Sequence, residues 1–226
     1  GFLTYNLNLG WSYNTLNRPI FPTSGQSHRL NAEIALPGSD VEYQKIVYDA
    51  QAFFPLGKDF ILRGYGKLGF GNDLPFYKNF YAGGYGTVRG YDNSTLGPKY
   101  DGVSYQELQA INPNNKADPT PEEVGGNALV QFGTELAIPL PFKGDWTRQI
   151  RPVLFAEGAQ VFDTQCDVPS SAKDLKLCKD QYDFDFNNMR YSVGVGFTWI
   201  TMIGPLSLSY AYPLNDKPGD NTKNIQ

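Results

Sequence analysis

Apolar and polar residues alternate along the first segment of the chain. From residue 3 to residue 14, every odd position is apolar or aromatic, starting at Leu3 and ending at Tyr13, and every even position is polar or glycine. A period of two residues is typical of a β-strand with one apolar and one polar face. Strands of soluble proteins average five or six residues, whereas a tilted strand needs about 9–11 residues to cross an outer membrane. The length of this segment therefore predicts a membrane-spanning strand.

The same alternation recurs seven times further along the chain. These segments are residues 29–36, 45–54, 60–70, 128–138, 150–157, 190–199 and 206–212. In segment 150–157 the pattern is blurred, because Val153 and Phe155 are apolar residues at positions of the polar side. Residues 224–226 are expected to begin a ninth strand. The pattern predicts an all-β fold of about eight antiparallel strands.

The connections between these segments differ in length in a regular way. Long connections follow the fourth, sixth and eighth segments, at residues 71–127, 163–188 and 213–223. Shorter connections rich in proline and glycine follow the third, fifth and seventh segments, at residues 55–59, 139–149 and 201–205. Short turns at one end and long loops at the other are typical of an up-and-down outer-membrane barrel. A connection as long as 71–127 usually signals a functional loop.

The polar face of the predicted strands favours a lipid-facing apolar side over a soluble sandwich. Five charged residues lie at mid-strand on this face: Arg63, Lys67, Glu135, Arg151 and Glu157. They would be costly inside a small soluble barrel, whereas a polar lumen tolerates them. Glycines at 133, 194 and 196 share this face, where small side chains allow loops or other chains to approach closely. Alternation alone does not say which face is inside, so a soluble all-β surface adhesin stays as the alternative.

Composition and charge exclude several other classes of protein. Tyr and Phe number 15 each and charged residues make up 19%, which excludes a disordered chain. A net charge of −4 argues against a nucleic-acid-binding protein. No apolar run approaches 18 residues, so no transmembrane helix is expected. The single histidine, His28, leaves little room for a His-based catalytic or metal site, and we expect neither a metal nor a cofactor.

The two cysteines lie in a polar stretch of the connection at 163–188. Cys166 and Cys178 lack the paired C-x-x-C units of a zinc site. A disulfide that closes a small loop is the favoured interpretation and implies an oxidising compartment, with two free thiols as the alternative.

One motif in the long connection indicates a docked loop. Residues 80–91 read FYAGGYGTVRGY, in which the loop glycines Gly83, Gly84 and Gly86 precede Arg89. Aromatic residues are too dense here for a segment surrounded by water, so we expect the loop to pack on the inside of the barrel rather than to be a flexible surface loop. A buried arginine requires carboxylate partners. The polar faces of the next two strands offer Glu135 and Glu157.

The motif Val88-Arg89-Gly90-Tyr91, preceded by FYAGG, resembles the signature of the BamA-type outer-membrane assembly factors. Further similarities follow in the family's order along nearly the whole chain. They are WSYN with FPTSG (residues 11–14 and 21–25), PFY (75–77), GGNA (125–128), and GPL with SYA (204–206 and 209–211). Mapped onto the sixteen-stranded barrel of that family, the eight segments are similar to the eighth through fifteenth strands. Residues 1–226 would then be the C-terminal portion of one outer-membrane barrel, with a lumen-directed loop at 71–127 and an end inside the last strand.

This resemblance implies assembly without catalysis. Members of the family fold and insert other β-barrel proteins into the bacterial outer membrane, and their loop arginine is held by acidic residues on the inner wall. The implied partners are outer-membrane lipid, client barrel proteins and periplasmic accessory lipoproteins, the last mainly through POTRA domains that this sequence lacks. A two-partner secretion transporter of the same superfamily is the alternative function. An isolated fragment could close as a small barrel or pair with a second copy through its open edges.

Overall fold

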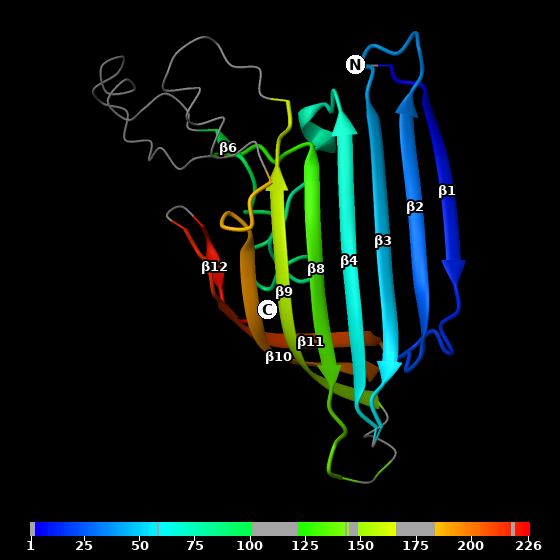
Figure 1. The fold of residues 1–226 in the computed structure, drawn as a ribbon, viewed down its shortest axis with the longest axis vertical. Coiled ribbons are helices and arrows are strands. Elements are labelled where there is room, and N and C mark those ends of the chain that lie inside the picture. The colour runs from blue at the N-terminus through cyan, green and yellow to red at the C-terminus, as the bar shows by residue number, and fades with distance from the viewer. Residues whose placement is uncertain are drawn as a thin grey trace, which may run out of the picture.

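Eight long antiparallel strands form one sheet in the computed structural model, which describes residues 3–57, 59–100, 122–142, 144, 149–165, 184–217 and 220–226. The strands are β1 (Asn6–Asn14), β2 (Gly25–Ala35), β3 (Gln44–Pro55), β4 (Ile61–Asn72), β8 (Ala128–Ala137), β9 (Ile150–Phe162), β10 (Arg190–Thr201) and β11 (Gly204–Pro213). Each pairs with its neighbour in this order, so the sheet is an up-and-down meander (Figure 1). The eight expected strands are confirmed. The first one begins at Asn6 rather than at Leu3, and the sixth continues to Phe162.

Shorter elements lie between the long strands. Within the connection from β4 to β8 they are the 3-10 helix η1 (Phe76–Lys78), β5 (Gly90–Tyr91), β6 (Lys99–Tyr100) and β7 (Glu122–Glu123). After β11, β12 (Thr222–Lys223) pairs with β5 rather than with the main sheet. The expected start of a ninth strand at 224–226 is confirmed by its pairing with β11: Ile225 bridges Tyr210, and three backbone hydrogen bonds join Ser209 and Ala211 to Asn224 and Gln226. The two residues of β12, just before it, pair with the long loop instead. No helix among the described residues is long and apolar enough to cross a membrane.

The two faces of the sheet differ sharply in exposure. We call the face that carries the loop the inner face; there Gln131 and Glu157 are 4% and 6% exposed. On the opposite, outer face large apolar side chains are open, with Phe132 42% and Val195 51% exposed. A protein surrounded by water buries its apolar face instead. The alternation in the sequence thus separates the two faces correctly, and the apolar face is the uncovered one.

The buried apolar core lies between the loop and the inner face. The loop contributes Phe80, Ala82, Val88, Tyr91 and Leu96, and the sheet contributes Leu129, Ala159 and Val161 from β8 and β9. Figure 1 shows the loop beside β8 and β9. Burial of apolar surface stabilises a contact by roughly 25 cal/mol per Å². The loop is therefore docked on the sheet by packing as well as by polar contacts.

Glycines of the inner face are covered mainly by neighbouring rings, which differs from the expectation that other chain segments would approach them. A Cβ atom added at Gly133 would lie 2.5 Å from the Tyr65 ring, and one at Gly194 would meet both the Tyr210 carbonyl oxygen of β11 and the Phe155 ring. At Gly196 the nearest groups belong to β11 itself. A missing side chain leaves a hole, which an adjacent aromatic ring can fill. Two glycines of β4 are covered by residues of the loop: Gly69 by the Phe80 ring and Gly71 by the Leu74 side chain.

Candidate functional site

Positive backbone dihedrals shape the loop around the arginine. Gly83, Gly84, Gly86 and Gly90 have φ of +106°, +88°, +114° and +93°, conformations that residues with a side chain rarely adopt. At Gly90 space is limiting as well, because an added Cβ would lie 3.3 Å from the Cβ of Ala211 on β11. The backbone can therefore turn directly against the sheet and direct Arg89 toward β8 and β9.

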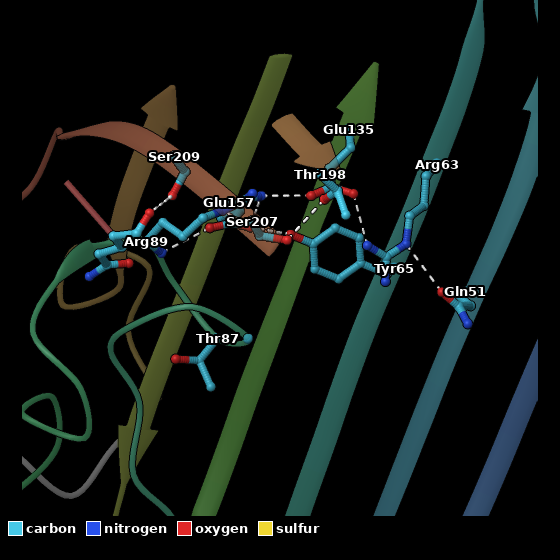
Figure 2. A network of polar contacts seen from close by, with 12 residues as sticks. Gln51, Arg63, Tyr65, Thr87, Arg89, Glu135, Glu157, Thr198, Ser207 and Ser209 are labelled. Atoms are coloured by element: carbon cyan, nitrogen blue, oxygen red, sulfur yellow. Dashed lines mark hydrogen bonds and ion pairs between the residues drawn. The ribbon is translucent and has the colours of Figure 1, made fainter. Parts of the chain in front are cut away.

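The structure brings Arg89, Glu135 and Glu157 together, and we call these three residues the Arg89 clamp. Nη2 of Arg89 donates to Oε1 of Glu135 at 2.7 Å, and Nε donates to Oε1 of Glu157 at 2.9 Å. Nη2 also donates to Glu157, whose other oxygen accepts the backbone N–H of Arg89 at 2.9 Å. The guanidinium therefore links two adjacent strands to the loop (Figure 2). Charge-assisted contacts of this kind are roughly twice as strong as neutral hydrogen bonds.

Both carboxylates have a second partner on β4. Arg63 donates to Oε2 of Glu135 at 2.8 Å, and it also contacts Gln51 of β3 at 3.1 Å. The hydroxyl of Tyr65 donates to Glu157 (Figure 2). Two arginines thus balance two glutamates, which offsets the cost of removing these charges from water.

Aromatic rings enclose the arginine. Its guanidinium carbon lies 3.5 Å from the centroid of the Phe155 ring and 5.5 Å from that of Tyr85. A cation over the face of a ring is attracted to it, and more strongly where water is excluded. Arg89 is 4% exposed. Burial lowers the pKa of its guanidinium, but the hydrogen bond and the charge of Glu157 outweigh this effect and raise the pKa.

Sequence reasoning missed Arg63, Tyr65 and Phe155 as members of this site. Phe155 was the apolar residue that blurred the alternation, and the structure turns it and Val153 to the inner face. An aromatic residue at an inward position was therefore the available signal. Tyr65 carries the same signal, because it lies between Arg63 and Lys67 on the polar face of β4. Its contact with Glu157 could not be predicted, because it depends on the register that sets Tyr65 opposite Gly133.

Residues on either side of the arginine hold the loop in the same position. Val88 and Tyr91 are fully buried. Nε2 of Gln131 on β8 donates to the carbonyls of Gly86 and Thr87 at 3.1 and 3.0 Å. Burial raises the pKa of the Tyr91 hydroxyl to about 12. The motif is thus fixed by its side chains and by its main chain.

The chain beyond β11 also contacts the motif, which the sequence did not predict. Thr222 and Lys223 pair with Tyr91 and Gly90, and the side chain of Gln226 donates to the Tyr91 carbonyl. Asp220 anchors this segment to β10 by two hydrogen bonds from Arg190. The loop therefore lies between β8 and β9 on one side and the segment 220–226 on the other.

The charged groups of the Arg89 clamp are fully occupied by one another and by their neighbours. Each carboxylate of the Arg89 clamp is neutralised by cations or hydroxyl donors, so neither resembles a free general base. A polar cavity of about 540 Å³ adjoins the clamp, lined by residues that include Arg29, Asp49 and Lys67. Among the residues that the structure describes, no group of three His, Cys, Asp or Glu side chains could hold a metal ion. The cysteines at 166 and 178 lie outside the described residues.

Known proteins share both the sequence and the fold. Residues 2–226 match the sequence profile of the Omp85 superfamily domain. The outer membrane protein assembly factor BamA of Neisseria meningitidis is 37% identical, over 98% of this chain and 28% of its own length. The mouse sorting and assembly machinery component 50 homolog is 26% identical over 90% of this chain and 40% of its own length.

A solved structure agrees with these relatives. The crystal structure of BamA from Haemophilus ducreyi lacking POTRA domains 1–3 matches with a TM-score of 0.79 and 31% identity, over 97% of this chain and 41% of that one. The chain thus spans less than half the length of these relatives. Their similarity over nearly all of its residues, together with the eight-stranded meander and the motif docked inside it, shows that the chain belongs to the Omp85 superfamily.

Proposed function

We propose that this chain acts in the folding and insertion of β-barrel proteins into the bacterial outer membrane. The single observation that carries the proposal is the 37% identity, over 98% of the chain, to a protein named as an outer membrane protein assembly factor. The mouse relative, which is also named as an assembly component, supports the same activity. In this role the chain performs no covalent chemistry.

Within this proposal the sheet is one portion of a larger barrel in the outer membrane. The exposed outer face contacts lipid, and the loops after β2, β4 and β9 lie at the cell-surface side. This arrangement is supported by the absence of charged residues from the outward positions of the eight strands, where Phe132 and Val195 are typical members. Client barrel proteins and periplasmic accessory lipoproteins are the proposed partners.

We further propose that the Arg89 clamp keeps the loop docked inside the barrel during assembly. The burial of Arg89 and its contacts to two strands support this role. A loop released from the inner face would expose the apolar residues of the loop core and leave Glu157 without its cation.

Reconstitution tests the proposed activity. Liposomes that contain the intact gene product are mixed with a urea-denatured outer-membrane barrel, and folding is followed by heat-modifiable migration on gels. We expect faster folding than in empty liposomes of the same lipid. Equal folding rates, together with export of an extended polypeptide from the same liposomes, would favour the secretion transporter instead.

A further inference from the structure

The loop makes a second charged contact with the sheet, on the opposite side of β4 from the Arg89 clamp. Nζ of Lys78, the last residue of η1, lies 2.7 Å from Oε1 of Glu33. Glu33 belongs to the inner face of β2, where it lies between Asn8 of β1 and Lys45 of β3 in the strand register. None of these residues contributes to the Arg89 clamp.

The acceptor carboxylate is held by other residues as well. Tyr43, which is 3% exposed, donates its hydroxyl to Oε1 of Glu33 at 2.6 Å. Nδ2 of Asn6 on β1 reaches the same oxygen at 3.0 Å and the Tyr43 hydroxyl at 3.1 Å. Glu33 is thereby oriented by the sheet itself, so that Lys78 meets an acceptor already in place.

The main chain of Lys78 is fixed too. Nζ of Lys45 donates to the Lys78 carbonyl and lies 4.2 Å from the centroid of the Phe80 ring. That ring in turn covers Gly69 of β4. The hydrogen bond to Glu33 raises the pKa of the Lys78 ammonium, so this group stays charged at neutral pH.

We propose that Lys78 and Glu33, with Tyr43, Asn6 and Lys45, form a second clamp that fixes the first part of the loop to β1–β3 independently of the Arg89 clamp. The loop is then attached to the inner face at two places, to β2 through Lys78 and to β8 and β9 through Arg89. The inference concerns how the loop is held and does not depend on the proposed function.

Hydrogen exchange of the intact gene product, purified in detergent, tests this second clamp. Three amides report on it: Lys78 bonds to Pro75 O, Asn79 to Phe76 O and Phe80 to Gly126 O, at 2.7, 3.3 and 2.8 Å. The side chains of Lys78 and Glu33 are 31% and 21% exposed, and for such a partly exposed pair we expect exchange to rise about fivefold in Lys78→Met. Exchange at residues 84–91 should stay unchanged, because the Arg89 clamp remains.

Two matched variants separate the clamp from a general effect of losing a lysine. Lys78→Arg keeps the cation and should restore protection at residues 76–80. Lys67→Met removes a lysine of the same inner face whose ion pair, at 3.9 Å to Asp49, lies within the sheet, and it should leave the loop amides unchanged. Wild-type exchange in Lys78→Met would overturn the proposal. An equal rise over residues 76–91 would also overturn it, because the loop would then open as one unit.

Glu33→Gln tests the same clamp from the side of the sheet. Glutamine keeps the size of the side chain and can still accept from Tyr43, but it removes the charge that holds Lys78. We expect the same local rise in exchange at residues 76–80 as in Lys78→Met. Unchanged exchange there would contradict the proposal even if Lys78→Met failed to fold.

Discussion

Replacing Arg89 with alanine should release the loop from β8 and β9. Among the described residues, the substitution leaves Glu157, whose side chain is 5% exposed, with the Tyr65 hydroxyl and the residue 89 amide as its donors. Removing one partner of a buried ion pair costs about 3–5 kcal/mol. Glu135 keeps Arg63 at 2.8 Å, so we take the lower end of this range, about 3 kcal/mol. At 1.4 kcal/mol for each factor of ten, the undocked loop becomes about a hundredfold more populated.

Hydrogen exchange measures this opening directly. In the docked loop the amide of Gly84 bonds to the Val88 carbonyl at 3.1 Å and that of Thr87 bonds to the Gly84 carbonyl at 3.2 Å. Their exchange should accelerate by about a hundredfold in Arg89→Ala, in line with the estimate above. Arg89→Lys should give an intermediate value, because lysine keeps the charge but cannot bind both carboxylates and stack on Phe155 in the same way.

A control and a double variant distinguish the clamp from a general loss of charge. Arg63→Ala removes an arginine whose side chain is 33% exposed and whose hydrogen bonds go to Glu135 and Gln51 of the sheet, so its effect on the loop amides should be much smaller. Arg89→Ala combined with Glu157→Gln should destabilise the docked loop by less than the sum of the two single changes, because no uncompensated carboxylate is left at position 157. Loop-amide exchange in Arg89→Ala within about threefold of the wild type would show that Arg89 does not hold the loop, since breaking a buried ion pair of this kind should have a far larger effect.

Four further predictions address the surroundings of the clamp and the outer face. Gly90→Ala should destabilise the docked loop by at least about 1 kcal/mol, measured by exchange at residues 88–91, because φ is +93° and Ala211 lies close. Asp220→Asn should weaken the contact with Arg190 and speed exchange of the Asp92 amide, which bonds to the Asn221 carbonyl at 2.7 Å. Loop docking, measured by amide exchange, should weaken as the pH rises from about 10, the ordinary pKa of tyrosine, toward the Tyr91 pKa of about 12, because the hydroxyl ionises more easily in the undocked loop. Tyr91→Phe should remove this part of the pH dependence. Val195→Arg on the outer face should lower the stability of the folded protein in a bilayer by about 2–4 kcal/mol and so reduce the amount of heat-modifiable, folded protein on gels. Ser207→Lys on the inner face should leave that amount unchanged. Equal amounts of folded protein in the two variants would contradict a lipid-facing outer side.

The fold could be predicted largely from alternation. A period of two residues over eight long segments determines both the number of strands and the face to which each side chain points. The same alternation assigned Glu135 and Glu157 to the inner face. Because a buried arginine needs carboxylate partners, these two residues were the expected partners of Arg89. These steps require only local sequence and the cost of burying a charge.

The rest of the site depends on distances that alternation does not contain. The contact of Tyr65 with Glu157 arises from the register between β4 and β8 and from the space above Gly133. Phe155 was obscured because an apolar residue facing inward breaks the pattern that identifies the faces. Likewise, the pairing of β12 with β5 joins segments more than 100 residues apart, and no periodic signal marks it.

The central claim is that a loop docked by Arg89 is required for barrel assembly, and one comparison tests it most directly. Cells that depend on the wild-type gene product, Arg89→Lys, Arg89→Ala or Glu157→Gln are compared for the amount of folded client barrel in the outer membrane. Hydrogen exchange at the loop amides is measured on the same four proteins. We expect client folding to fall in the same order as the protection of the loop amides, with the largest loss in Arg89→Ala. Normal client folding in Arg89→Ala, with its loop shown to be released, would contradict the claim.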